Sequence, residues 1–136
     1  MVSRPRFRTL AHGADLRIAV WGADEEELIR NAVAAAGTLA LGTVPRLRSP
    51  DWAPILPWPT DLPSRLVRAV NEALFRLYAR QELAVGFELI PGGARLALAP
   101  LPPGFRPELE VKAATYHDLR PRRRAERLAA QITLDV

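Results

Sequence analysis

Apolar and polar side chains alternate in several short runs of the chain, and this period of two is typical of strands with one buried face. The clearest run is LRIAVWG, residues 16 to 22, and a shorter one covers residues 5 to 10. LAAQITLDV, residues 128 to 136, closes the chain with the same alternation, and TVPRLR, residues 43 to 48, is also strand-like. The pattern therefore predicts strands near both ends of the sequence.

Two segments show helical spacing instead, and each follows an aspartate that can cap a helix. Asp24 precedes a glutamate-rich first turn, which predicts a helix over residues 25 to 40 that stops near Gly42. Asp61 precedes a second apolar stripe, which predicts a helix over residues 62 to 80. We expect these two helices to be the whole helical content.

Between residues 82 and 100 the sequence predicts an antiparallel hairpin. ELAVGFELI and ARLALAP are strand-like, and PGG between them supplies glycines for a tight turn. ELEVKAATY, residues 108 to 116, is expected to form a further strand, and residues 118 to 127 a basic connection.

The proline-rich segment SPDWAPILPWPTDLP, residues 49 to 63, separates the two predicted helices. Proline removes a backbone donor and fixes φ, so we expect an irregular connection here. Its large apolar side chains are expected to pack as a lid on the core: Trp52, Ile55, Leu56 and Trp58.

Together these elements predict an α+β fold in which two helices pack on a largely antiparallel β-sheet. With 136 residues, 49% of them hydrophobic and 25% charged, the chain suits a single compact domain, residues 1–136. No cysteine is present, which excludes a disulfide framework, a thiolate metal site and a cysteine nucleophile. No segment has the apolar length of a signal peptide core or a membrane span, so we expect a cytoplasmic protein without membrane contact.

The formal net charge is +4, and Lys112 is the only lysine among the basic residues. Abundant arginine fits a GC-rich or thermophilic source as well as it fits a function. Five arginines lie within residues 120 to 127, where they can hold phosphate groups. The same stretch is open to a second interpretation, a solvated loop without a ligand.

Two aspartates are the first candidates for a metal site. Asp15 follows a glycine-containing turn at the start of a predicted strand, and Asp135 is the last residue but one of the closing strand. If those strands are neighbours, both side chains and the α-carboxylate of Val136 can converge on one hard cation. A turn aspartate and a frayed terminus explain the same residues without any ligand.

The only histidines are His12 and His117, so any general acid–base role must use one or both of them. Each also suits a hydrogen-bonded structural role. A phosphate-binding glycine loop, a zinc pattern and a Ser-His-Asp spacing are all missing from the sequence. The chain therefore offers few groups for catalysis.

Three stretches, in order, resemble the archease family. His12-Gly13-Ala14-Asp15, with the strand and glutamate-rich helix start after it, is similar to the family's His-Thr-Ala-Asp opening, with glycine in place of threonine. VKAATYHDL, residues 111 to 119, is close to its Lys-Ala-Val-Thr-Tyr-His signature, and ITLDV resembles its closing strand. VNEALFRLY stands where archeases carry a Leu-Asn-Glu-Leu-Leu helix. The likeness covers essentially the whole chain.

The resemblance implies a non-catalytic accessory protein that promotes guanylylation and multiple turnover of an RtcB-type RNA ligase in tRNA splicing and RNA repair. It also implies a divalent cation, seen as calcium in the family, and the ligands it implies here are Asp15, Asp135 and Val136. The surrounding residues that would contact the ligase are His12, Lys112, Tyr116 and His117. Contact with RNA itself would be weak or indirect.

Two other function classes stay open from the residues themselves. An autonomous phosphotransfer or hydrolytic enzyme would use the same cation to activate water beside His117. A passive RNA-binding or chaperone-like module would act through the basic loop at residues 120 to 127, with an affinity that falls steeply with salt.

Overall fold

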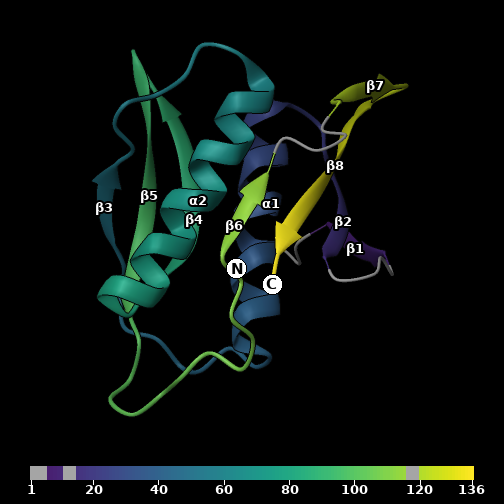
Figure 1. Ribbon diagram of the computed structural model, residues 1–136. Coiled ribbons are helices and arrows are strands. Elements are labelled where there is room, and N and C mark those ends of the chain that lie inside the picture. Colours follow the sequence, from purple (N-terminus) through teal and green to yellow (C-terminus); the bar gives the residue numbers. More distant parts are fainter. Residues whose placement is uncertain (1–5, 11–14, 116–119) are drawn as a thin grey trace.

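The computed structural model describes residues 6–10, 15–115 and 120–136. Two helices and eight strands follow one another along this part of the chain, and Figure 1 labels them. In chain order they are β1 (Phe7–Leu10), β2 (Leu16–Gly22), α1 (Glu25–Leu41), β3 (Asp51–Pro54), α2 (Leu62–Arg80), β4 (Glu82–Ile90), β5 (Gly93–Pro100), β6 (Ala113–Thr115), β7 (Arg122–Arg124) and β8 (Arg127–Asp135).

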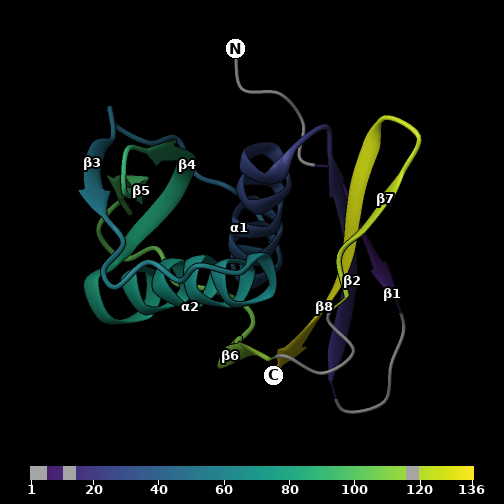
Figure 2. The ribbon, with the colours of Figure 1, turned by 90° about the horizontal axis from the view of Figure 1, so that it is seen from above.

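The strands form two separate antiparallel sheets. The larger sheet has the order β1-β2-β8-β6, with β7 also paired to β8, and the smaller has the order β3-β5-β4. Figure 2 shows the small sheet on the left, the large sheet on the right and α1 between them. The predicted α+β class, with two helices and antiparallel strands, is confirmed, although the strands make two sheets where the sequence predicted one.

Helix α1 lies at the centre of the molecule and is apolar around most of its circumference, which is typical of a buried helix. It contacts β2 on one side and both β4 and α2 on the other. As predicted, the Asp24 carboxylate caps it, accepting a hydrogen bond from the Glu27 backbone N–H at 2.9 Å. Gly42 ends it with a φ of 75°, a conformation that suits glycine.

Helix α2 is amphipathic and lies between β4 and β6, contacting both. Its N-terminus is capped by Asp61, whose carboxylate accepts a hydrogen bond from the Ser64 N–H at 3.0 Å. This backbone hydrogen bond holds the pKa of Asp61 below its ordinary value. Along the described chain, neither helix is long and apolar enough to cross a membrane.

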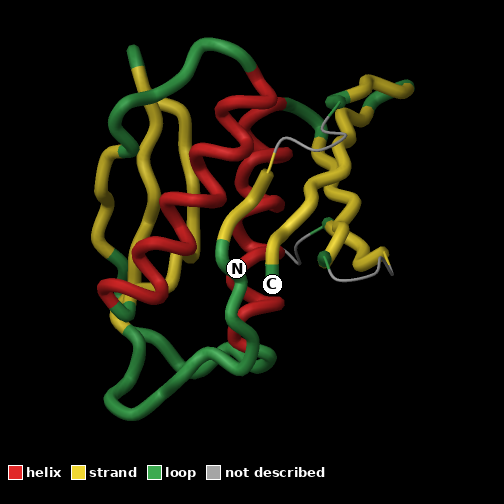
Figure 3. Tube along the Cα trace, viewed as in Figure 1, coloured by secondary structure: helices red, strands yellow, loops and turns green. Residues whose placement is uncertain are grey.

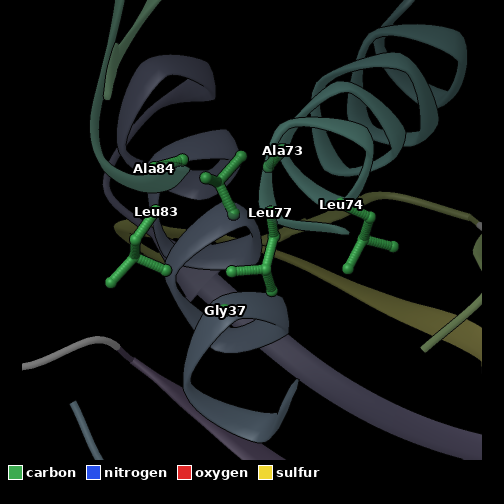
Figure 4. A pocket seen from close by; sticks show the side chains of 7 residues that line it. Gly37, Ala73, Leu74, Leu77, Leu83 and Ala84 are labelled. Carbon is green, nitrogen blue, oxygen red and sulfur yellow. The ribbon is translucent and has the colours of Figure 1, made fainter. Parts of the chain in front are cut away.

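Small side chains line the contact of the two helices with β4. Figure 4 shows Gly37, Ala73 and Ala84 meeting three leucines there. The space between these side chains leaves no room for a water molecule. A Cβ on Gly37 would lie only 2.9 Å from the Leu83 Cδ1 atom, so a larger residue there would require the Leu83 side chain to move.

The predicted hairpin and closing strand are both present. Strands β4 and β5 pair antiparallel around the turn at residues 91 and 92, where Gly92 has a φ of 74°. In β8, Ala130, Ile132 and Leu134 face the core as the alternation predicts. The register of β8 therefore follows from its own sequence.

The prediction for the proline-rich segment was wrong in part. It contains the strand β3, whereas residues 43–48, expected to be a strand, lie in a loop. Because β3 pairs only with β5 and forms the edge of its sheet, its proline does not interrupt a ladder on the outer side. Of the expected lid, Ile55 is buried and Trp58 packs on the core, but Trp52 is 45% and Leu56 is 71% exposed.

Two further predictions were wrong in extent. Of the strand expected over residues 108–116, only β6 pairs among the described residues, and residues 108–112 belong to one of two long loops at the same end of the molecule (Figure 3). The expected basic connection contains β7, which pairs antiparallel with β8. Ala125 makes the turn of this hairpin with a positive φ of 50°.

Candidate metal site

Strand β8 lies between β2 and β6, so its C-terminal end has a neighbour on both sides. Leu134 is paired with Leu16 of β2 and with Ala114 of β6. These three side chains lie in one row across the sheet, and Leu134 and Ala114 are buried. Because these three residues are paired, the residue after Leu134 and the residue before Leu16 lie at the same rim of the sheet.

Asp15 and Asp135 are the next residues along β2 and β8 beyond the Leu16–Leu134 pair. The antiparallel register therefore brings the two aspartates to the same end of two neighbouring strands. Asp15 is exposed and Asp135 is half-buried. In the described residues, no lysine or arginine forms an ion pair with either aspartate. The neighbouring strands that the sequence analysis required are thus present.

Lys112 and Val136 lie at the same rim. The Lys112 backbone N–H donates a hydrogen bond of 2.7 Å to the Asp135 carbonyl oxygen, which ties the residue before β6 to the end of β8. The side chains of Lys112 and Val136 are exposed. The rim therefore gathers two carboxylates, the last residue of the sequence and the only lysine.

The described residues of this rim offer oxygen donors to a metal ion. In residues 6–10, 15–115 and 120–136, no three His, Cys, Asp or Glu side chains lie close enough together to hold a metal ion. A cation here would need oxygens beyond the two aspartates, such as the backbone carboxylate of Val136 and water. A hard ion such as Ca²⁺ accepts such mixed oxygen ligands, so the residues present fit it in kind.

The other predicted contact residues are not among those that the structure describes. His12, Tyr116 and His117 lie outside the described residues. Strand β6 runs away from Asp135, so Thr115, its last residue, lies opposite Thr133. Of the four predicted contact residues, the structure thus places Lys112 alone.

Helix α2 holds β6 and the residues before it, a feature that the sequence analysis missed. The Asn71 side chain accepts a hydrogen bond of 2.7 Å from the Ala114 N–H and donates one of 3.3 Å to the Ala114 carbonyl oxygen. The Asn71 amide therefore pairs with β6 much as another strand would. The signal in the sequence is an asparagine next to the apolar stripe of an otherwise well-formed helix.

Tyr78 makes the second connection from α2. Its hydroxyl accepts a hydrogen bond of 2.8 Å from the Val111 N–H and donates one of 2.6 Å to the Leu109 carbonyl oxygen. Burial of the ring raises the pKa of Tyr78, and the Val111 hydrogen bond opposes this only in part. The two connections hold the chain on both sides of Lys112.

A groove of about 630 Å³ runs between α2 and this segment. Asn71, Phe75 and Tyr78 line one wall, and Val111 and Lys112 line the other. The Phe75 side chain is 52% exposed there. An open apolar groove therefore lies directly beside the rim that carries the aspartates.

Comparison with known proteins gives the family. The sequence model of the Archease protein family (MTH1598/TM1083) matches residues 7–136. The chain belongs to the archease family. The match includes every element from β1 to β8, so the resemblance of the three archease-like stretches is confirmed. No match is found among curated proteins.

Two solved structures share the archease fold. An archease from Thermotoga maritima, described as a possible chaperone, has a TM-score of 0.71 at 18% identity, covering 95% of this chain and 96% of that one. Protein 1598 of Methanobacterium thermoautotrophicum has a TM-score of 0.72 at 22% identity, covering 98% of this chain and 100% of that one. The two-sheet arrangement is therefore that of archeases.

Proposed function

We propose that this archease is a non-catalytic accessory protein of an RtcB-type RNA ligase in tRNA splicing and RNA repair. It promotes guanylylation of the ligase and so allows multiple turnover. A divalent cation, calcium in our proposal, binds Asp15, Asp135 and the backbone carboxylate of Val136. The ligase contacts the surrounding rim, which includes Lys112 together with His12, Tyr116 and His117.

The observation that carries the proposal is the register of β2 and β8. It brings Asp15 and Asp135 to one rim although 119 residues of sequence separate them. Like charges opposite one another on neighbouring strands destabilise a sheet. Among the described residues, no positively charged side chain pairs with Asp15 or Asp135. Placing the two carboxylates together therefore does not stabilise the sheet, and a ligand that neutralises both explains the arrangement best.

The chemistry of the ligand follows from the donor atoms. Carboxylate oxygens favour hard cations, and the sequence has no cysteine that could favour a soft metal. A bound cation would supply positive charge that holds the chain end beside the start of β2. The residues of this chain would orient that end towards the ligase.

Cation binding is tested by calorimetric titration of the protein with CaCl₂ and with MgCl₂. Asp15→Asn is expected to lower the affinity by at least about tenfold, because one charged ligand is lost. Asp51→Asn is the matched control, since Asp51 is an exposed aspartate on the other sheet. Equal affinity of both variants would reject the site.

Ligase activation is tested by pre-steady-state guanylylation of the cognate ligase with and without this protein. We expect a faster guanylylation step and more than one turnover per ligase in its presence, and loss of both effects in Asp15→Asn. An unchanged rate and turnover would reject the function, whatever the outcome of the cation titration.

Lys112→Ala separates partner contact from cation binding. Only the backbone of Lys112 is bonded to Asp135, so the truncated side chain leaves that hydrogen bond in place. We expect unchanged cation affinity and a weaker activation of the ligase. A fusion after Val136 should abolish cation binding while one before Met1 should not, and equal binding by both fusions would exclude the Val136 carboxylate as a ligand.

A further inference from the structure

The outer face of the large sheet carries a row of arginines that the cation site does not use. Residues directly opposite one another in a sheet share a face. Arg122 is opposite Ala129, which is itself opposite Trp21, and Arg124 is opposite Arg127. All these residues therefore lie on the face away from the core, where Arg122 and Arg124 are about 7 Å apart along the strand.

These arginines line a single groove. A space of about 540 Å³ is bordered by Arg120, Arg122, Arg124 and Arg127. Its floor includes Ala19 and Ala129, whose small side chains allow a ligand to come close to the sheet, and Gln131 adds an amide. Most of its lining residues belong to the β7–β8 hairpin, which Figure 1 shows projecting at the end of β8 opposite to the C-terminus.

The charge of the groove is not neutralised within the described residues. Arg120, Arg122 and Arg124 are exposed and form no ion pair with any carboxylate in that part of the chain. The guanidinium of Arg127 lies over the Trp21 ring, with its Cζ atom 4.9 Å from the ring centroid. This stacking restricts the side chain before any ligand binds, so less conformational entropy is lost on binding.

We propose that this arginine groove binds the phosphate backbone of a single-stranded nucleic acid. Guanidinium groups pair with phosphate oxygens in bidentate geometry, and several of them in a row suit a ligand whose charges also repeat. The groove is a second site, separate from the cation site at the other end of β8. It gives the basic stretch at residues 120–127 a ligand, where the sequence alone favoured a solvated loop.

A nucleic acid fits this groove better than an acidic protein does. Protein interfaces combine charge with apolar anchors at their centre, whereas the walls here are arginines and the floor is alanine. Such a surface provides charge and close approach with little else, which suits a backbone read without regard to sequence.

The experiment is fluorescence anisotropy of a labelled single-stranded RNA 20-mer titrated with the intact protein between 50 and 200 mM KCl. Four phosphate contacts predict a slope of log affinity against log salt of about −3, and a loss of affinity of about 50-fold over this range. Arg122→Gln/Arg124→Gln is expected to reduce the slope to about −1.4 and the loss to about 7-fold.

Arg123→Gln is the matched control. Arg123 lies between the two groove residues in the same strand and carries the same charge, but it is opposite Leu128 on the other face and donates to the Ala23 carbonyl oxygen. We expect its slope to equal that of the unaltered protein. An equal fall in Arg123→Gln would show general attraction to net charge and would overturn the proposal.

Two further results would overturn it. One is the absence of measurable RNA binding at 50 mM KCl. The other is displacement of the labelled RNA by polyglutamate of matched charge as effectively as by unlabelled RNA, and this result would indicate an acidic protein ligand. Thermal unfolding of each variant checks its fold. If the double variant does not fold, the single variant Arg124→Gln should still lower the slope by about 0.7.

The outcome is independent of the ligase proposal. Asp15→Asn should bind RNA like the unaltered protein, because Arg122 and Arg124 are opposite positions of β8 that lie six or more residues before Asp135. RNA binding lost in both Asp15→Asn and Arg122→Gln/Arg124→Gln would contradict two separate sites.

Discussion

Asn71→Ala tests whether α2 holds the strand beside the candidate metal site. The substitution removes both hydrogen bonds between the Asn71 amide and the backbone of Ala114. Ala114 is only 4% exposed, so its N–H and carbonyl group would lose their partners at a position that water reaches poorly. Strand β6 is at the edge of its sheet, and among the described strands none lies on its other side to replace the lost contacts.

The expected loss follows from the two backbone groups. An unsatisfied buried donor or acceptor costs about 1–3 kcal/mol, and partial access of water to the vacated space favours the lower part of that range. Two groups give about 2.5 kcal/mol, from which alanine recovers about 0.5 kcal/mol through its higher helix propensity. The net fall in the free energy of unfolding is about 2 kcal/mol.

Urea unfolding measures that free energy, and hydrogen exchange of the Ala114 amide reports on the contact itself. Asn31→Ala is the matched control, because Asn31 is a buried asparagine of α1 with one such bond, from its Nδ2 atom to the Trp21 carbonyl oxygen at 2.7 Å. We expect about half the loss there and no change in Ala114 exchange. A change below about 0.5 kcal/mol in Asn71→Ala, with Ala114 still protected, would refute the reasoning.

Three further predictions concern stability. Gly22→Ala should lower the free energy of unfolding by about 2 kcal/mol, because its Cβ would lie 2.7 Å from the Leu28 backbone nitrogen, whereas Gly93→Ala, with no atom closer than 4.0 Å, should change little in the same urea assay. Backbone hydrogen bonding lowers the pKa of Asp61 from 3.8, so the carboxylate stabilises the folded protein above pH 3.8 and this contribution is lost as the pH falls through the pKa of the folded state. Asp61→Asn should remove this pH dependence of stability. Burial raises the pKa of Tyr78 above 10.0, so the protonated hydroxyl contributes to stability below pH 10.0 and this contribution is lost as the pH rises through the pKa of the folded state. The stability of Tyr78→Phe should therefore fall less in alkali, as unfolding at a series of pH values would show.

The helices could be predicted from the sequence because their signals are local. Asp24 and Asp61 each accept the backbone hydrogen bond that their position in the sequence suggested, and Gly42 ends α1 with a positive φ. A cap depends on residues three or four positions away, which the sequence shows directly. Both helix boundaries were therefore within a residue of the prediction.

The short strands could not be predicted because they depend on partners that are distant in sequence. The alternation that suggested a strand over residues 108–116 is real, but Tyr78 of α2 bonds the backbone at Leu109 and Val111 and so keeps it out of the sheet. The arginine-rich residues of β7 show no apolar alternation, and they pair because β8 extends beyond β6 on the side that β2 does not occupy. Tertiary contacts decide both cases.

The aspartates of the candidate site stand between these extremes. Alternation in LRIAVWG and in the closing strand fixed which face of each strand is buried, but neither run contains information on whether the two strands are neighbours. The pairing of Leu16 with Leu134 supplies that information. The sequence thus supplied the two candidate carboxylates, and the fold brings them to the same rim.

Strand β8 separates the two proposed sites by a distance at which their charges act independently. Six residue steps lie between Ala129, which is opposite Arg122, and Asp135, and this corresponds to about 20 Å in an extended strand. The Debye length at physiological ionic strength is about 8 Å, so exposed charges this far apart are largely screened from one another. The arginines therefore cannot offset the repulsion between Asp15 and Asp135, nor can the aspartates reduce the attraction of the groove for phosphate. Under the two proposals each end of the strand therefore takes its own counter-ion, a cation at the aspartates and an anion at the arginines.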